Sequence, residues 1–189
     1  MRAYYAKGLP EKGERRLAIF LLVGVALCWA VLDQGVKHWA ETTLTLRDPV
    51  PVVGETLQWY LVYNSGAAFS ILSDKTWVFT VLAAVVIGVI LWHIPKINSL
   101  RWAAAIGLML GGTLGNLYDR LFRAPGFAVG HVVDMISTPW LVPAVYNVAD
   151  IGLVGAVIVM IILTLLNVRA ERKKPKEGRS AAAETVRDA

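Results

Sequence analysis

The chain has 189 residues, of which 56% are hydrophobic and 17% are charged, and its mean hydropathy is +0.54. These values disfavour an ordinary soluble domain and are typical of a single small membrane domain. The formal net charge of +5 does not indicate nucleic-acid binding, because the basic residues gather at the two chain ends and in one short connection rather than along a binding stripe.

A helix needs roughly 20 apolar residues to cross a bilayer, and four segments approach this length. In chain order they cover residues 17–32, 76–94, 101–122 and 147–168. Pro95 ends the second segment. The sequence therefore predicts a mainly α, polytopic membrane protein with four transmembrane helices in one domain, residues 17–168, and with both chain ends on the same side of the membrane.

Charge asymmetry gives the orientation, because short loops rich in lysine and arginine stay in the cytoplasm. Most of the 19 lysines and arginines lie in a basic arm (1–16), in the connection between the second and third segments (95–101) and in the tail (169–189). The connections 38–75 and 123–146 are therefore expected outside the cytoplasm. The tail is polar and rich in small residues, and it is expected to be a disordered cytoplasmic end.

The first apolar segment follows a basic arm, so a removable signal peptide is an alternative interpretation. Leu27 stands where a lipid-attachment site before Cys28 would need a small residue, and no A-x-A stretch follows. We therefore expect the segment to be retained as a helix. Cys28 is the single cysteine of the chain, which excludes an internal disulfide and a cysteine-based metal site.

Ionisable side chains in membrane segments are costly, so each is expected to be paired, to lie at an interface or to be functional. In "DQGVK", Asp33 and Lys37 are four residues apart on one helical face and can form an ion pair. The pair either anchors the end of the first helix or supports a site, and the residues alone leave both alternatives open.

The third segment ends in "GGTLGNLYDR". Gly111 and Gly115 have the small-xxx-small spacing that lets membrane helices approach closely, which favours packing over phosphate binding. Asn116 and Arg120 are also four residues apart and share a helical face. Because a guanidinium near the bilayer needs acceptors, we expect carboxylates from other segments to converge on Arg120.

Two acids are candidates for that role, Asp134 in "GHVVD" and Asp150 in "NVAD". They are 16 residues apart, so the chain has to turn back between them. Asn147 with Asp150 also fits a helix cap, and Asp134 alone could be a loop residue. Two carboxylates within hydrogen-bonding range share a proton, so that one activates a water while the other protonates the attacked carbonyl. The set indicates an aspartic peptidase.

Other chemistries have weaker support. No G-x-S-x-G or H-E-x-x-H motif occurs, and His131 with Asp134 would give two metal ligands at most, so we expect no metal and no cofactor. A small membrane transporter or proton-relay subunit is the main alternative, because paired acids and an arginine also serve ion pathways. A scaffold whose polar residues merely lock the helices together is a second alternative.

Five ordered motifs, "DQGVK", "NSGAAFS", "GGTLGNLYDR", "GHVVD" and "YNVAD", resemble those of the lipoprotein signal peptidases, or signal peptidase II, across residues 17–168. The resemblance implies an aspartic endopeptidase of the bacterial cytoplasmic membrane, with its active site toward the extracytoplasmic side. Its substrates would be diacylglyceryl-modified prolipoproteins, cleaved on the amino side of the lipidated cysteine. It also implies a small extracytoplasmic β-sheet cradle, and residues 55–70 have the alternating β-branched and aromatic character to supply it.

By match to the family motifs, Asp134 and Asp150 are the catalytic pair. The residues expected to bind substrate or support the site are Asn64, Asn116, Arg120, Asn147, Asp33 and Lys37. Membrane lipid and prolipoproteins are the expected partners, nucleic acid is not, and the chain is expected to act as a monomer. Met135 and Tyr146 depart from the common family pattern, which concerns the shape of the pocket more than its chemistry.

Within the pair we expect Asp150 to hold the negative charge, because it lies at the start of a helix, and Asp134 to hold the shared proton more often.

Overall fold

The structure is a computed structural model that describes residues 12–66 and 76–170. The helices of this part of the chain are α1 (Lys12–Thr43), α2 (Thr76–His93), α3 (Leu100–Phe122) and α4 (Val148–Leu165), with a short 3-10 helix, η3 (Ile94–Lys96). The strands are β1 (Val50–Val53), β2 (Leu57–Asn64), β3 (Val132–Thr138) and β4 (Val142–Tyr146). The strands form one antiparallel sheet in the order β1-β2-β3-β4.

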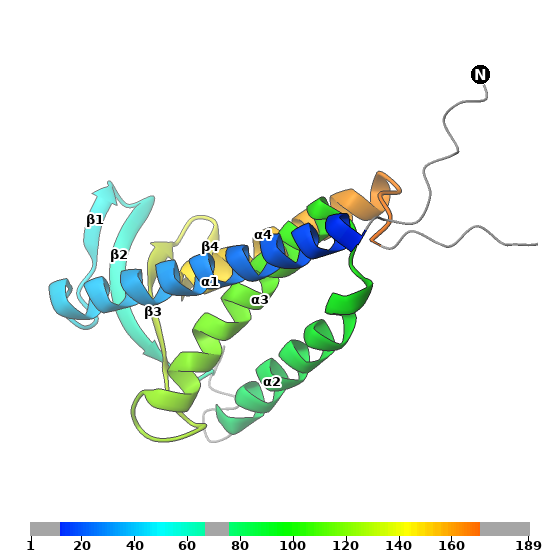
Figure 1. Ribbon diagram of the computed structural model, residues 1–189. Coiled ribbons are helices and arrows are strands. Elements are labelled where there is room, and N and C mark those ends of the chain that lie inside the picture. The colour runs from blue at the N-terminus through cyan, green and yellow to red at the C-terminus, as the bar shows by residue number, and fades with distance from the viewer. Residues whose placement is uncertain (1–11, 67–75, 171–189) are drawn as a thin grey trace, which may run out of the picture.

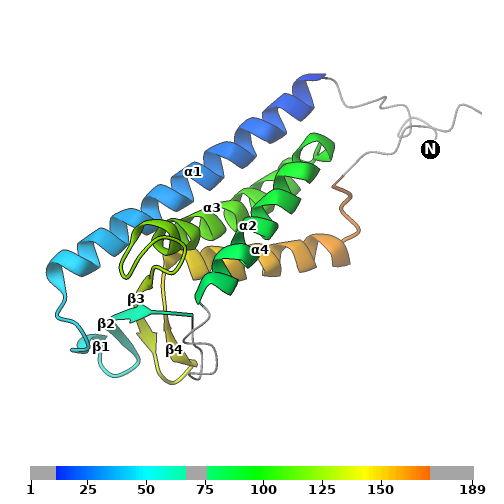
Figure 2. The same cartoon turned by 90° about the horizontal axis from the view of Figure 1, so that it is seen from below.

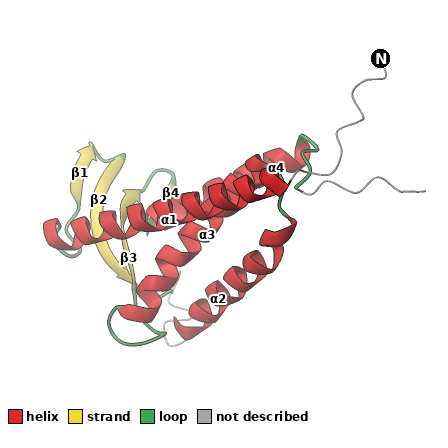
Figure 3. Ribbon diagram, viewed as in Figure 1, coloured by secondary structure: helices red, strands yellow, loops and turns green. Residues whose placement is uncertain are grey.

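The helices form a bundle with the sheet at one end (Figure 1, Figure 3). Helix α3 is central, since α1, α2 and α4 all pack against it. The start of α1 and the end of α4 both lie at the end of the bundle away from the sheet (Figure 1), although Figure 2 shows them apart from each other. We call these two ends of the bundle the sheet end and the terminal end.

Small residues set the spacing between the helices. A side chain at Gly107 would lie 2.6 Å from the carbonyl oxygen of Leu22, and one at Gly111 would lie 2.6 Å from that of Ala26. Gly115 faces the carboxylate of Asp33 in the same way. The predicted packing role of Gly111 and Gly115 is therefore confirmed, and the close approach of α1 to α3 depends on it.

Three of the helices are long and apolar enough to cross a membrane, namely α1, α2 and α4. They carry large apolar side chains on their outer faces, where Phe20, Trp92 and Leu165 are each at least three-quarters exposed. Because a soluble bundle would bury such side chains, this surface fits a lipid environment. The fold is the mainly helical membrane architecture with a small sheet that the sequence predicts.

Two boundaries differ from the sequence expectation. Helix α1 begins at Lys12, inside the segment interpreted as the basic arm, because the residues before the apolar run continue its helical turns. Strand β2 accounts for the expected strand character of residues 55–70 up to Asn64, whereas residues 67–75 lie outside the described residues. The predicted disordered tail also lies outside them from residue 171.

Candidate active site

Strands β2 and β3 bring the first candidate acid to the sheet end of the bundle. Asp134 lies within β3 opposite Val62, and Asn64 of β2 pairs with Val132. Asn64 and Asp134 are therefore diagonal neighbours on one face of the sheet, which is within reach of a polar side chain. The amide Nδ2 of Asn64 donates to Asp134 Oδ2 at 2.8 Å. The alternative that Asp134 is a loop residue is wrong, since the strand and its neighbour fix it.

The second candidate acid begins α4. The side chain of Asn147 accepts a hydrogen bond from the backbone N–H of Asp150 at 3.0 Å, and the backbone N–H of Asn147 donates to Asp150 Oδ2 at 3.2 Å. These two bonds form a capping box. The predicted cap is therefore present, and it leaves the other carboxylate oxygen of Asp150 facing α3.

Two asparagine side chains join the acids. Asn147 Nδ2 donates to Asp134 Oδ1 at 2.6 Å and to Asn116 Oδ1 at 3.1 Å, while Asn116 Nδ2 donates to Asp150 Oδ1 at 2.9 Å. A continuous path of hydrogen bonds thus runs from Asp134 through Asn147 and Asn116 to Asp150. Asn147 is fully buried, so its bonds to both sides fix the relative position of β3, α3 and α4.

A buried ion-pair network holds this arrangement from the side of α1. Lys37 Nζ lies 2.7 Å from Asp33 Oδ2 and 2.8 Å from Asp119 Oδ2, and it donates to Asn116 Oδ1 at 3.0 Å. Asp33, Lys37 and Asp119 are completely buried. Asp33 also accepts the backbone N–H of Ala149 at 2.8 Å. The predicted pair of Asp33 and Lys37 is confirmed, and it orients both Asn116 and the start of α4.

Asp119 is the residue of this network that sequence reasoning missed. Besides Lys37, it accepts hydrogen bonds from Gln34, from Nε of Arg123 at 2.8 Å and from the backbone N–H of Val133 at 3.2 Å. Asp119 therefore connects β3 to α1 and α3, and its contact in β3 is with Val133, the residue before Asp134. Its spacing from Asn116, three residues along the same helix, was the available signal.

Arg120 is buried next to these acids but is not paired with them. The charges of Asp134, Asp119 and Asp150 all act on its guanidinium. Among the described residues, however, the ion pairs of the acids go to Lys37 and Arg123, and Nη1 of Arg120 has no hydrogen-bond partner. The expected convergence of acids near Arg120 is therefore confirmed, but carboxylates are not its direct hydrogen-bond acceptors in the part of the chain that the structure describes. The asparagines and Lys37 already occupy the oxygens that would have faced it.

The two acids lie in different environments. Asp134 is 1% exposed, whereas Asp150 is partly exposed. Burial, together with the nearby charge of Asp150, raises the pKa of Asp134 from 3.8 to about 7, although hydrogen bonds from Asn64 and Asn147 oppose the shift. Asp134 can therefore hold a proton near neutral pH, as a carboxyl group that donates a proton to a substrate must.

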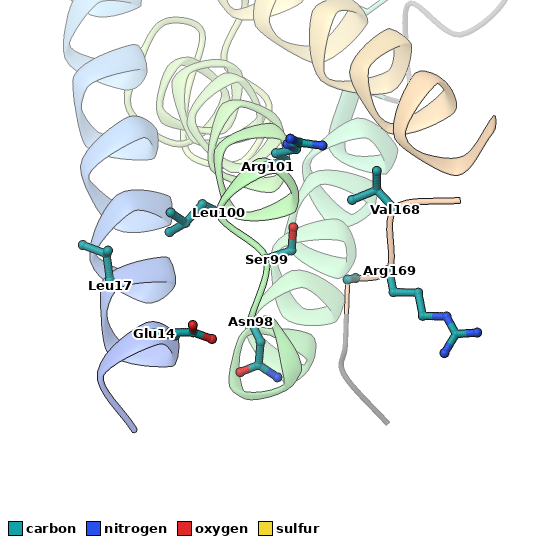
Figure 4. A pocket seen from close by; sticks show the side chains of 9 residues that line it. Glu14, Leu17, Asn98, Ser99, Leu100, Arg101, Val168 and Arg169 are labelled. Atoms are coloured by element: carbon teal, nitrogen blue, oxygen red, sulfur yellow. The ribbon is translucent and has the colours of Figure 1, made fainter. Parts of the chain in front are cut away.

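One cavity lies apart from this site, at the other end of the bundle. A cavity of about 380 Å³ lies at the terminal end, with Glu14, Ser99 and Arg169 among its lining residues (Figure 4). Among its described lining residues Glu14 is the one carboxylate, and none of them belongs to the network at the sheet end. Within the described residues, no three His, Cys, Asp or Glu side chains are grouped so that they could hold a metal ion.

A membrane helical bundle in which hydrogen bonds link two aspartates at one end fits the class of polytopic membrane hydrolases that work by general acid–base chemistry. Comparison with known proteins narrows the class. The family model described as "Signal peptidase (SPase) II" matches residues 25–166. The chain belongs to the signal peptidase II family, whose members are aspartic-type peptidases of the bacterial inner membrane.

Individual relatives agree. The lipoprotein signal peptidase of Leifsonia xyli subsp. xyli is 42% identical over 160 residues, which cover 85% of this chain and 74% of the relative. That of Mycobacterium tuberculosis (strain ATCC 25618 / H37Rv) is 44% identical over 151 residues, covering 80% and 73%. A solved bacterial membrane enzyme at 2.3 Å resolution is 27% identical, with a TM-score of 0.67 over 90% of this chain and 98% of the other.

Proposed function

We propose that this signal peptidase II uses Asp134 and Asp150 as its catalytic pair to cleave diacylglyceryl-modified prolipoproteins on the amino side of the lipidated cysteine. Cleavage of the signal peptide from prolipoproteins follows from the family and from the shared name of its relatives. The observation that carries the assignment is the hydrogen-bonded path from Asp134 through Asn147 and Asn116 to Asp150.

The raised pKa of Asp134 supports a division of roles within the pair. Asp150 accepts a proton from the attacking water, whose oxygen bonds to the scissile carbonyl carbon, and Asp134 donates its proton to the carbonyl oxygen. When the tetrahedral intermediate collapses, Asp150 passes its proton to the leaving nitrogen as the C–N bond breaks. Asp134 then regains a proton from the hydroxyl group that becomes the new carbonyl, so the pair returns to its starting state.

The donors around Asp150 support its role as the charged partner. The backbone N–H of Asn147 and the amide of Asn116 donate to its two oxygens, and the first turn of α4 adds the favourable end of the helix dipole. The residues that support the acids are thus Asn64, Asn116, Asn147, Asp33 and Lys37. Arg120 Nη1, which has no partner in the described part of the chain, is available to a substrate acceptor.

The place of the site suits a substrate that is anchored in lipid. We propose that the sheet end lies on the extracytoplasmic side, where the acyl chains of the modified cysteine can stay in the bilayer while the scissile amide reaches the acids. The partly exposed Asp150 at the mouth of α4 gives the required water access. Membrane lipid is then a direct partner, and a monomer is sufficient because one chain supplies both acids.

The test is cleavage of a diacylglyceryl-modified prolipoprotein by the purified chain in detergent, beside Asp134→Asn and Asp150→Asn and with a chelator present. We expect the wild type to cleave in the presence of the chelator. Each variant should lose about 10²–10⁴-fold in turnover, because that is the contribution of a general acid or base, while keeping its thermal unfolding midpoint within a few degrees. Cleavage that survives either substitution would refute the assignment. A folded wild-type chain that cleaves no lipidated substrate would favour a proton-relay subunit.

A further inference from the structure

The amino-terminal turn of α2 is hydrogen-bonded to the segment that follows Asn64. Thr76 is buried, and its Oγ1 donates to the backbone carbonyl of Ser65 at 2.8 Å. The backbone N–H of Gly66 donates to Asn64 Oδ1 at 2.7 Å. This bond turns the amide nitrogen of Asn64 toward Asp134, so α2 is coupled to the site through the turn at residues 64–66.

Gly66 allows the ring of Phe79 to close over this turn. Its φ is +95°, and a side chain there would lie 2.5 Å from Cδ2 of Phe79 and 3.3 Å from Nη2 of Arg120. A glycine is therefore required both by the backbone conformation and by the close approach of the ring. One turn after Thr76, Phe79 fills the space between Gly66 and Arg120.

The same ring faces the guanidinium of Arg120. The distance from Arg120 Cζ to the centroid of the Phe79 ring is 5.1 Å, which is within the range of a cation–π interaction. Arg120 is 8% exposed, and its buried Nη1 has no hydrogen-bond partner within residues 12–66 and 76–170. A buried donor left unsatisfied is costly, so the free Nη1 requires an explanation.

We propose that Phe79 is a positioning residue, which holds the Arg120 guanidinium so that its unpartnered Nη1 can bind a backbone carbonyl of the substrate next to the aspartate pair. The proposal rests on the proposed function. In this proposal Phe79 affects the substrate through Arg120, whose guanidinium its ring faces. The aromatic face supplies attraction without using any N–H donor, which leaves Nη1 for the substrate, whereas a carboxylate partner would occupy the donors.

The experiment measures kcat and KM for a lipidated prolipoprotein peptide with wild type, Phe79→Tyr and Phe79→Leu. Tyrosine keeps the π face and leucine keeps only apolar bulk. We expect Phe79→Tyr to stay within about twofold of wild type, and Phe79→Leu to raise KM about three- to thirtyfold with kcat changed by less than about twofold. The matched control is Trp77→Leu in the same turn of α2, where the side chain is 53% exposed, and its KM should not change.

A double-mutant cycle separates positioning from packing. In an Arg120→Gln background, measured by single-turnover cleavage with enzyme in excess, Phe79→Leu should cause less than about a twofold further loss. Arg120→Lys provides a second background if the glutamine variant does not fold. If Phe79→Leu causes the same loss in the wild-type and Arg120→Gln backgrounds, Phe79 only packs and the proposal is wrong. An unchanged KM in Phe79→Leu would also overturn it. Cleavage by the wild type would still support the proposed function in either case. If the folded wild type does not cleave, both proposals fall.

Discussion

At the scale of single residues, the site contains two identical side chains that differ in what surrounds them. Asp134 lies in β3 beside β2, is buried and accepts hydrogen bonds from the amides of Asn64 and Asn147, and its burial raises its pKa in spite of these bonds. Asp150 begins a helix, is partly exposed and accepts hydrogen bonds from a backbone N–H and from Asn116. This contrast agrees with the expectation that the proton resides on Asp134 and the charge on Asp150.

A pH profile follows from this contrast. The proposed acid, Asp134, must hold its proton, and its pKa is raised to about 7, so activity should be lost as the pH rises through that value. We expect kcat/KM to level off about one unit below this pKa and to fall about tenfold per unit well above it. The check is kcat/KM for a lipidated peptide between pH 5 and 9, about two units on either side of that pKa. A profile that stays flat to the alkaline end would contradict the assigned role of Asp134.

The hydrogen bond from Asn64 allows the alkaline limb to be assigned to Asp134. This bond lowers the pKa of Asp134, so Asn64→Ala should raise that pKa and move the limb to higher pH. Asn98→Ala is the matched control, because Asn98 lines the cavity at the terminal end and has no contact with the pair. A limb that moves to lower pH, or that moves equally in the control, would assign the titration to another group.

At the scale of elements, the other three long helices pack against α3, and the glycines of α3 allow α1 and α4 to approach it closely. Gly107 and Gly111 face α1, whereas Gly112 faces α4. Trp29 of α1 also donates through its indole nitrogen to the carbonyl of Val148 at 3.0 Å. The start of α4, and with it Asp150, is thus fixed by direct contact with two helices.

Gly112→Ala should test this dependence. Its added carbon would lie 2.5 Å from the carbonyl oxygen of Ala149 and 3.0 Å from Cγ of Leu153, so α4 must move away from α3. We expect a loss of roughly 1–3 kcal/mol in unfolding free energy, and a fall in kcat because the bond from Asn116 to Asp150 lengthens. Thermal unfolding and cleavage in the same detergent provide the two readouts.

Gly24→Ala is the control for that substitution. Gly24 lies in α1 with nothing within 4 Å of an added side chain, so alanine should be neutral or should stabilise the helix by up to about 1 kcal/mol. Cleavage should be unchanged. Equal effects of the two substitutions would show that the contact between α3 and α4 does not position Asp150.

At the scale of the whole molecule, the sequence predicts what local spacing determines. Asp33 and Lys37 are four residues apart on one helix, and Asn147 with Asp150 forms a cap, so both pairs could be read directly. The sequence could not show that Asp134 sits within a strand or that Asp119 bonds to Val133, because both depend on the pairing of distant segments. The sequence also could not show which acid pairs with which base. Asp119 is next to Arg120 in the sequence, but its ion pairs are with Lys37 and Arg123.

The number of membrane crossings also belongs to this scale. Helix α3 is not among the three helices that are apolar enough by themselves to span a bilayer. However, β2 precedes α2 and β3 follows α3, and the two strands are paired in one sheet. If α2 crosses the membrane, α3 must cross back to return the chain to that sheet. Its lower hydropathy has a physical reason, because α3 is surrounded by the other helices rather than by lipid.

We therefore expect four crossings, with both chain ends in the cytoplasm. The test uses single cysteines in a Cys28→Ser background, Glu55→Cys in the turn between β1 and β2 and Lys96→Cys in η3, both at exposed positions. In intact spheroplasts, a membrane-impermeant maleimide should label the first cysteine and should reach the second only after permeabilisation, since the cytoplasmic loops carry the basic residues. Labelling of Lys96→Cys alone from outside would mean that the chain has the opposite orientation. Labelling of both cysteines from outside would mean that α2 does not span, and the proposal that the acids face the extracytoplasmic side would then lose its basis.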